Sequence, residues 1–210
     1  AKTQLGPDGT GVGHVFWCTV EGKQDLGTLR AIQDWYVNLN LQSVQGVAEV
    51  ASVGGYVRQY QVDVDPNKMK GFGVSVADVR NAVMRSNNDV GGKILEVSDA
   101  EFFVRGQGYI QSERDIENIV VGGGANGTPV YVRNIGTVQL GGDIRRGSLE
   151  KDGKGQVVGG IVVMRYGENA KDVIDRVKQK IHEITPGLPK GVEIKTSYDR
   201  SDLIDAAIGT

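Results

Sequence analysis

Two segments near the ends of the chain share one pattern of apolar and polar positions. Residues 13–22 are rich in β-branched and aromatic side chains, as strands are, and an alternating stretch at 46–55 predicts a second strand after a helix. The same order of strand, helix and strand returns at 156–199. We therefore predict two copies of one strand–helix–strand unit, over 11–55 and 156–199.

Each unit contains apolar residues that recur every three or four positions, which is the spacing of a helix with one buried face. In the first unit this stripe consists of Leu29, Ile32, Tyr36 and Leu39. In the second unit it consists of Val173, Val177, Ile181 and Ile184. Asp25 and Asn169 precede the two stripes and are predicted to cap the helices.

Neither unit covers much core by itself, so we expect the two to share one sheet. Helices packed on a single face of that sheet would make a ferredoxin-like sandwich. The predicted fold class is α+β, and residues 11–55 with 146–199 are predicted to form this first domain.

The intervening residues, 56–145, have a pattern of their own. They begin with an alternating strand, and a short helical turn starts at Pro66. Asp63 and Asp65 alternate onto one face of the strand and are expected either to be solvated or to cap this turn. Ser75 and Asp78 have the spacing of a capping box before a further helix, and Ser112 and Asp115 repeat that spacing. We interpret this insertion as a second α+β domain that interrupts the first.

Residues 91–108 predict a β-hairpin bordered by glycine pairs. Its two strands carry the apolar residues Ile94, Leu95, Val97, Phe102, Phe103 and Val104. A free two-stranded arm cannot bury this much apolar surface by itself. We expect the hairpin to project and to cause concentration-dependent self-association, and the alternative is that it folds back onto its own domain.

The last residues, 200–210, predict the beginning of an apolar helix. Ser201 has the character of an N-cap, and Asp202 places negative charge in the first turn. Neither a basic last turn nor a proline follows the apolar residues, so the helix has no stop signal.

Composition and charge restrict the class of protein. The chain of 210 residues is 39% hydrophobic and 24% charged, with a net charge of −2, which is typical of a soluble globular protein. This balance argues against a nucleic-acid partner, and the single cysteine excludes an intrachain disulfide framework.

Candidate chemistry is sparse. His14 and Cys18 lie four residues apart on a predicted strand, so both are expected on one face, and Met164 on the second unit's strand could face the same cleft. These three residues are therefore candidates for lining a metal path, and the alternative is that they fill the core. We predict no catalytic residues, no cofactor and no enzymatic activity.

Several motifs resemble one transporter family in the correct order. They are QYQVDVDPNKM, GVSVADVRNAV, GTPVYVRNIGTVQLG and GGIVVMRYGENA. In this combination they resemble resistance–nodulation–cell division (RND) efflux pumps. The motifs SNNDVGG and PGLPKGVEIKTSYDRSDLID resemble the heavy-metal branch of that family, the Czc and Cus type.

The resemblance implies a layout for the chain. Residues 11–55 with 146–199 would be the second porter subdomain of the N-terminal periplasmic loop, and 56–145 would be the funnel docking domain. Residues 200–210 would be the juxtamembrane start of a transmembrane helix. The projecting hairpin would then contact the neighbouring protomer.

The resemblance also implies location and partners. The chain would be the periplasmic portion of a proton-driven pump in a Gram-negative inner membrane. Its partners would be two further copies of the chain in a trimer, a periplasmic adaptor (membrane fusion) protein, an outer-membrane channel and heavy-metal cations. The alternative from the residues alone is a soluble ferredoxin-like binding module, an RNA binder or a small-molecule sensor.

Overall fold

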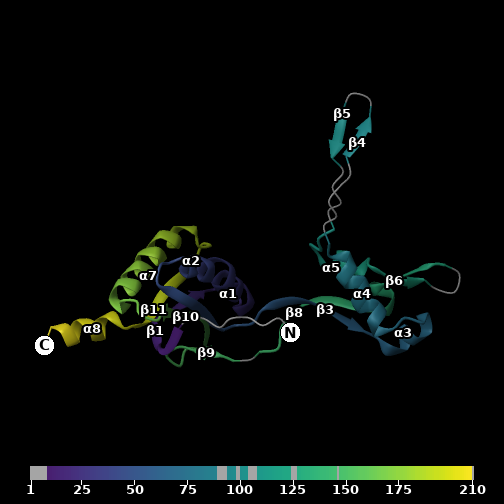
Figure 1. Ribbon diagram of the computed structural model, residues 1–210. Helices are drawn as coiled ribbons and strands as arrows, with labels where there is room; N and C mark the ends of the chain where they lie inside the picture. The colour runs from purple at the N-terminus through teal and green to yellow at the C-terminus, as the bar shows by residue number, and fades with distance from the viewer. Residues whose placement is uncertain are drawn as a thin grey trace. The chain divides into compact units, whose positions relative to one another are not determined.

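The computed structural model describes residues 9–88, 94–97, 100–103, 108–123, 127–145 and 147–209. The chain divides into two compact units, Ala1–Arg58 with Gly142–Thr210, and Gln59–Gly141 (Figure 1). The second unit is thus an insertion in the first. Helices and antiparallel strands are mixed along the chain, as the α+β prediction states.

The first unit contains an antiparallel sheet with the strand order β11-β1-β10-β2 (Figure 1). Its strands are β1 (Gly9–Gly22), β2 (Val47–Gly54), β10 (Gln156–Arg165) and β11 (Val192–Asp199). β10 lies between β1 and β2, and β1 lies between β10 and β11. The two strand–helix–strand units therefore interlock, because the two strands of each unit are separated by a strand of the other.

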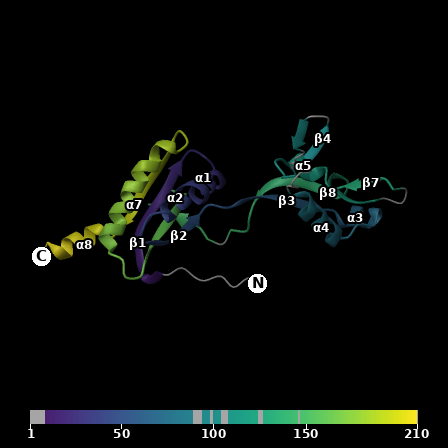
Figure 2. The same ribbon diagram turned by 45° about the horizontal axis from the view of Figure 1, so that its top comes forward.

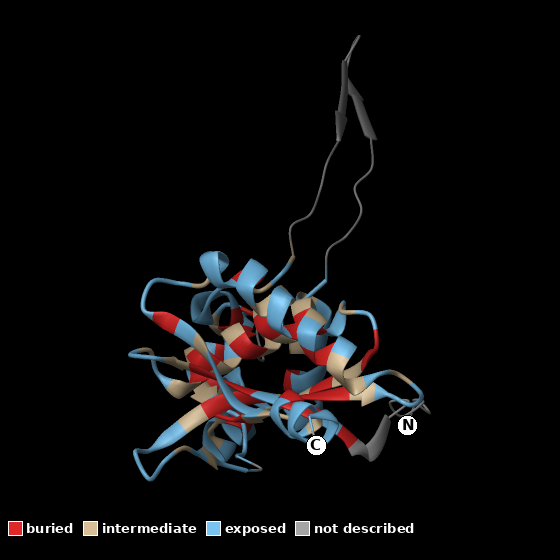
Figure 3. Cartoon of the chain, turned by 90° about the vertical axis from the view of Figure 1, so that its left-hand side faces the viewer, coloured by how far each residue is buried: buried red, intermediate tan, exposed pale blue. Residues whose placement is uncertain are grey.

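Helices cover one face of this sheet, with the core between the two layers (Figure 2). They are α1 (Leu26–Ile32), the π-helical turn η1 (Gln33–Val37), α2 (Asn38–Gln42) and α7 (Ala170–Ile184), which the 3₁₀ turn η2 (Thr185–Gly187) extends. Phe16, Leu41 and Ile174 are among the largest fully buried side chains. Figure 3 marks the buried residues along the strands and helices.

The π-helical turn changes which residues of the first helix face the core. The backbone N–H of Asn38 donates to the carbonyl of Gln33, five residues earlier. The turn therefore adds a residue relative to an α-helix, and Val37 and Leu41 are fully buried. Leu39 is 54% exposed, so its predicted place in the buried stripe is wrong.

The second unit has its own core, which is built from several short elements. The elements are β3 (Arg58–Val64), α3 (Pro66–Phe72), α4 (Val76–Ser86), β4 (Ile94–Val97), β5 (Ala100–Phe103), α5 (Glu113–Glu117), β6 (Val120–Gly123), β7 (Pro129–Tyr131), α6 (Val132–Ile135) and β8 (Gly136–Gly142). β3 pairs with β8, and β6 pairs with β7. The buried residues include Met69, Val79, Ile116, Val132 and Ile135.

The helix caps of this unit follow the sequence prediction. The Asp65 carboxylate accepts hydrogen bonds from the backbone N–H groups of Asn67 and Lys68, at 2.8 and 3.3 Å. Capping boxes begin α4, with Ser75 and Asp78, and α5, with Ser112 and Asp115. These local signals are confirmed.

The predicted hairpin corresponds to β4 and β5, which pair antiparallel with Ile94 opposite Phe103 and Leu95 opposite Phe102. Val104 lies outside the described residues.

The C-terminal helix α8 (Ser201–Ile208) begins differently from the prediction. Ser201 is the first helical residue, and the Asp199 carboxylate accepts from the Ser201 backbone N–H at 2.9 Å and from its hydroxyl at 2.7 Å. Lys178 of α7 forms an ion pair with the same carboxylate at 2.5 Å. In the described part of the chain, no helix is both long and apolar enough to span a bilayer.

Asn169 allows the predicted helix cap at the start of α7 to be tested. Its side chain accepts hydrogen bonds from the backbone N–H groups of Lys171 and Asp172 at the start of α7. We expect Asn169→Ala to lower the free energy of unfolding by about 1 kcal/mol, because these groups lose their acceptor. Urea titration followed by circular dichroism measures the change. Asn169→Ser is the control that keeps a capping oxygen, and equal losses in both variants would contradict the capping role.

Candidate functional site

The face of the first unit's sheet that points away from the helices is the candidate site, and we call it the open face. Along β1, Phe16, Cys18 and Val20 belong to the core, so the alternate residues Trp17 and Thr19 point to the open face. Glu21 follows on the same face. The neighbouring strands contribute Val157, Gly159 and Ile161 from β10 and Lys195 and Ser197 from β11.

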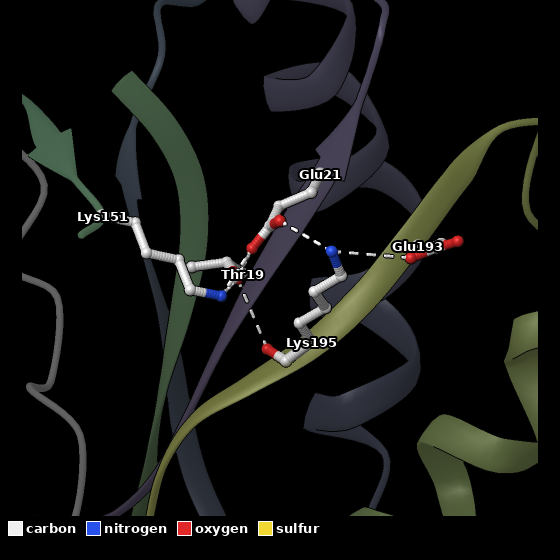
Figure 4. Close-up of polar contacts among 5 residues, drawn as sticks. All are labelled: Thr19, Glu21, Lys151, Glu193 and Lys195. Atoms are coloured by element: carbon white, nitrogen blue, oxygen red, sulfur yellow. Dashed lines mark hydrogen bonds and ion pairs between the residues drawn. The ribbon is translucent and has the colours of Figure 1, made fainter. Parts of the chain in front are cut away.

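A network of charged side chains crosses the open face (Figure 4). Lys151 Nζ donates to Glu21 Oε1 at 2.6 Å and to the Thr19 hydroxyl at 3.2 Å. The Thr19 hydroxyl in turn donates to Glu21 Oε1 at 2.7 Å. Lys195 Nζ donates to the other carboxylate oxygen, Oε2, at 3.1 Å. Both oxygens of Glu21 are therefore occupied by ammonium groups.

The register of the strands explains why two lysines are present. Glu21 lies directly opposite Glu193, and like charges in that position are destabilising. Lys195 lies two residues along β11 and forms ion pairs with Glu21 and, at 3.7 Å, with Glu193. Lys151 adds a second positive charge next to Glu21, so the network is electrically balanced.

The lysines fix the ionisation of Glu21. The hydrogen bond from Lys151 is the largest cause that lowers the pKa of Glu21, from its ordinary value of 4.5 to about 2, and Thr19 and Lys195 add to it against the opposing effect of burial. The hydrogen bond with Glu21 raises the pKa of Lys195. Glu21 is thus ionised throughout the neutral and mildly acidic range.

A cavity of about 250 Å³ lies beside this network. Its apolar lining comes from Trp17, Val53, Leu149, Val157 and Ile161, and Thr19 and Lys151 supply polar groups. Such a mixture suits an apolar or amphiphilic group better than a bare ion.

Glycine is required at the bottom of this cavity. A Cβ atom on Gly159 would lie 2.6 Å from the carbonyl oxygen of Cys18 and 2.9 Å from Leu149 Cδ2. The short strand β9 (Leu149–Glu150) pairs with the first residues of β10 and brings Leu149 to this point. The glycine therefore allows a second layer of chain to approach the sheet.

An aromatic pair continues the open face toward the end of β11. The rings of Trp17 and Tyr198 lie 5.5 Å apart between centroids and are inclined by 54°. Their exposed fractions are 41% and 39%, so each ring keeps a solvent-facing surface. Aromatic side chains that are half exposed in this way provide contact area for a ligand or a second protein surface.

The structure does not bring the three predicted metal-path residues together. β1 has an irregular register between His14 and Phe16, which shifts the alternation of its side chains. His14 is exposed while Cys18 is 2% exposed, so the expectation that both share one face is wrong. Met164 is half-buried and packs against the core of the first unit.

The chemistry of Cys18 also disfavours metal binding. Its Sγ donates to the carbonyl oxygen of Gly160 at 3.8 Å, and burial raises the pKa of the thiol to about 11. A protonated thiol is a poor metal ligand. Within the described ranges, no cluster of three or more His, Cys, Asp or Glu side chains is arranged to hold a metal ion.

The sequence pattern does not single out Glu21, Lys151 and Lys195 as members of a site. The alternation of polar and charged residues on the two strands is visible in the sequence, as Thr19 with Glu21 and Glu193 with Lys195. Their pairing depends on β1 lying next to β11, and Lys151 reaches the network from a different segment. The sequence gives no direct signal of either contact.

The low pKa of Glu21 makes stability depend on pH. Because the pKa is lower in the folded state, the stabilising contribution is complete above about pH 4.5 and is lost as the pH falls through about 2. We expect Glu21→Gln to remove about 1 kcal/mol of unfolding free energy at pH 7, a value that allows for solvent screening, and less at pH 2.

Urea titrations between pH 2 and 7 measure this difference. Glu193→Gln is the matched control, because the Glu193 side chain is 71% exposed and has one long ion pair. If the difference in unfolding free energy between Glu21→Gln and the unmodified chain does not change with pH, the low pKa of Glu21 is contradicted.

Comparison with known proteins identifies the family. The sequence profile of the AcrB/AcrD/AcrF family matches residues 1–210. The cation efflux system protein CusA of Escherichia coli (strain K12) is 47% identical over 210 residues, which are 99% of this chain and 20% of that protein. The cobalt-zinc-cadmium resistance protein CzcA of Cupriavidus metallidurans is 39% identical over 216 residues, covering 98% of this chain and 20% of that protein.

A solved structure gives the same result. The crystal structure of a heavy metal efflux pump (crystal form II) superimposes with a TM-score of 0.86 at 31% identity, over 99% of this chain and 21% of that one. The chain thus spans about a fifth of the length of the relatives it matches. The resemblance to heavy-metal RND pumps is confirmed, and the chain belongs to the AcrB/AcrD/AcrF family.

Proposed function

We propose that this chain is the periplasmic part of a proton-driven inner-membrane pump that exports heavy-metal cations. In this proposal 11–55 with 146–199 form a porter subdomain that lines the substrate cleft. Residues 56–145 form a docking domain at the exit funnel, and 200–210 begin a transmembrane helix. The relatives named above, which are efflux and resistance proteins, support this assignment.

The open face is the observation that carries the proposal. Helices cover the opposite face of the sheet, whereas this face presents the cavity, the charged network and the aromatic pair. The strand order β11-β1-β10-β2, with one helical segment in each strand–helix–strand unit, supports the ferredoxin-like interpretation of this subdomain. A sheet with one face free of helices is suited to form the wall of a cleft.

The chemistry of the open face fits a wall better than a metal site. Both carboxylate oxygens of Glu21 are paired with lysines, and Cys18 is buried and protonated. Of the three predicted metal-path residues, the proposal therefore keeps only His14, which is exposed. Strong metal ligands and the groups that carry protons would be supplied by other parts of the pump.

The assembly follows from the same assignment. The pump would be a homotrimer that contacts a periplasmic adaptor and an outer-membrane channel through its docking domains. The hairpin of β4 and β5, with Ile94, Leu95, Val97, Phe102, Phe103 and Val104, would contact the neighbouring protomer. No catalysis by this chain is proposed, since its relatives are transporters.

A chimera tests the transport role. The matching fifth of Escherichia coli CusA is replaced by this chain, and growth of a strain that lacks its own pump is measured on Zn²⁺, Co²⁺, Cu⁺ and Ag⁺. We expect the chimera to restore growth on at least one cation. A chimera that inserts, forms trimers and restores growth on none would contradict the proposal.

The two tryptophans of the chain give a matched pair of variants in that chimera. Trp17→Ala alters the open face and should lower the tolerated cation concentration. Trp35→Ala alters a side chain that is 77% exposed on the helix layer, and it should leave tolerance unchanged. If both variants tolerate the same cation concentration at equal amounts of trimer, the proposal that the open face lines the cleft is wrong.

The hairpin is tested in the isolated chain. We expect concentration-dependent self-association in sedimentation velocity, because burying the exposed apolar surface of a projecting arm against a second molecule is favourable. Phe103→Asp should weaken this association and leave the circular dichroism spectrum unchanged, and Phe103→Leu, which keeps an apolar side chain, should retain it. If Phe103→Asp unfolds the chain, the hairpin packs on its own domain.

A further inference from the structure

Residues 149–155, which we call the strap, lie against the open face of the sheet. They comprise β9 and the turn that leads into β10. β9 contributes two paired positions, Leu149 with Val157 and Glu150 with Gln156. Strand pairing this short is marginal without other contacts.

The turn of the strap contains backbone φ angles in the left-handed region. Asp152 has a φ of 54°, and it is the single non-glycine residue with positive φ in the described ranges. Gly153 and Gly155 also have positive φ, at 66° and 124°. A non-glycine residue in this region costs conformational energy unless neighbouring contacts hold it.

Two side chains hold the strap in place. Leu149 occupies the space above Gly159, where a Cβ atom would be only 2.9 Å away. Lys151 extends to β1 and contacts Glu21 at 2.6 Å and Thr19 at 3.2 Å. The apolar contact and the ion pair therefore fasten the strap to two different strands of the sheet.

Separation of the Lys151–Glu21 ion pair leaves no buried charge without a partner. When Lys151 leaves, Glu21 keeps Lys195 on Oε2 and the Thr19 hydroxyl on Oε1. The side chains of Lys151 and Glu21 are 25% and 24% exposed, so water can replace each partner. The high cost of breaking a buried ion pair does not apply here.

The strap also forms one wall of the cavity. Leu149, Glu150 and Lys151 line it together with Trp17 and Ile161 of the sheet. We propose that the strap alternates between the closed position of this structure and an open one, that the Lys151–Glu21 ion pair fastens the closed position, and that opening gives access to the cavity. This inference rests on contacts within the first unit and does not require the transport role.

Hydrogen exchange measured by mass spectrometry on the 210-residue chain tests the proposal. Peptides from 147–157 should exchange about tenfold faster than peptides from 158–165, because local opening precedes global unfolding. Lys151→Met keeps the apolar stem and removes the charge, and it should speed exchange of 147–157 by about two- to fivefold. Raising the salt concentration should speed this exchange in the unmodified chain more than in Lys151→Met.

Lys154→Met is the matched control, since it makes the same chemical change on the same strap without touching the Lys151–Glu21 pair. Acrylamide quenching of Trp17 in a Trp35→Phe background gives a second readout, and Lys151→Met should increase it. The proposal fails if 147–157 exchange no faster than 158–165. It also fails if Lys151→Met and Lys154→Met behave alike in both measurements.

Discussion

The pairing of β1 with β10 on one side and with β11 on the other is the constraint on which the first unit depends. Cys18 and Gly160, which face each other in this pairing, are 142 residues apart in the chain. The cost of closing such a loop grows slowly with its length. The intervening segment contains a compact unit with its own core, which shortens the effective loop between the two strands.

The open face is a consequence of this central position of β1. Its core-facing residues are buried under the helices, which fixes the opposite side chains, Trp17 and Thr19, on the other face. Pairing with β11 places Glu21 opposite Glu193, and lysines must then balance the charge. Pairing with β10 places Gly159 beside Cys18, where the absence of a side chain leaves room for β9. The charged network and the cavity thus both arise from the register of one strand.

Local features of the fold could be predicted from the sequence because short-range chemistry decides them. Asp25 and Asn169 cap their helices as predicted, since a side-chain oxygen needs only the next few N–H groups. Leu39 was misplaced because a π-helical turn, which has no clear sequence signal, shifts the buried stripe. The prediction that His14 and Cys18 share one face is wrong because strict alternation does not hold through the irregular part of β1. The contacts of Glu21 required the strand order, which periodicity alone does not give.

The pairing of both Glu21 oxygens with lysines has a physical consequence for the proposed pump. A cation that moves through a cleft must be attracted to it and must also leave. Glu21 is paired on both oxygens, so it adds little net attraction and offers no vacant position for a metal. Its charge instead fastens the strap and balances the neighbouring strand. In the proposed pump, therefore, the charges of the open face would maintain the shape of the cleft wall, and selection among ions would fall to ligands on the other walls of the cleft.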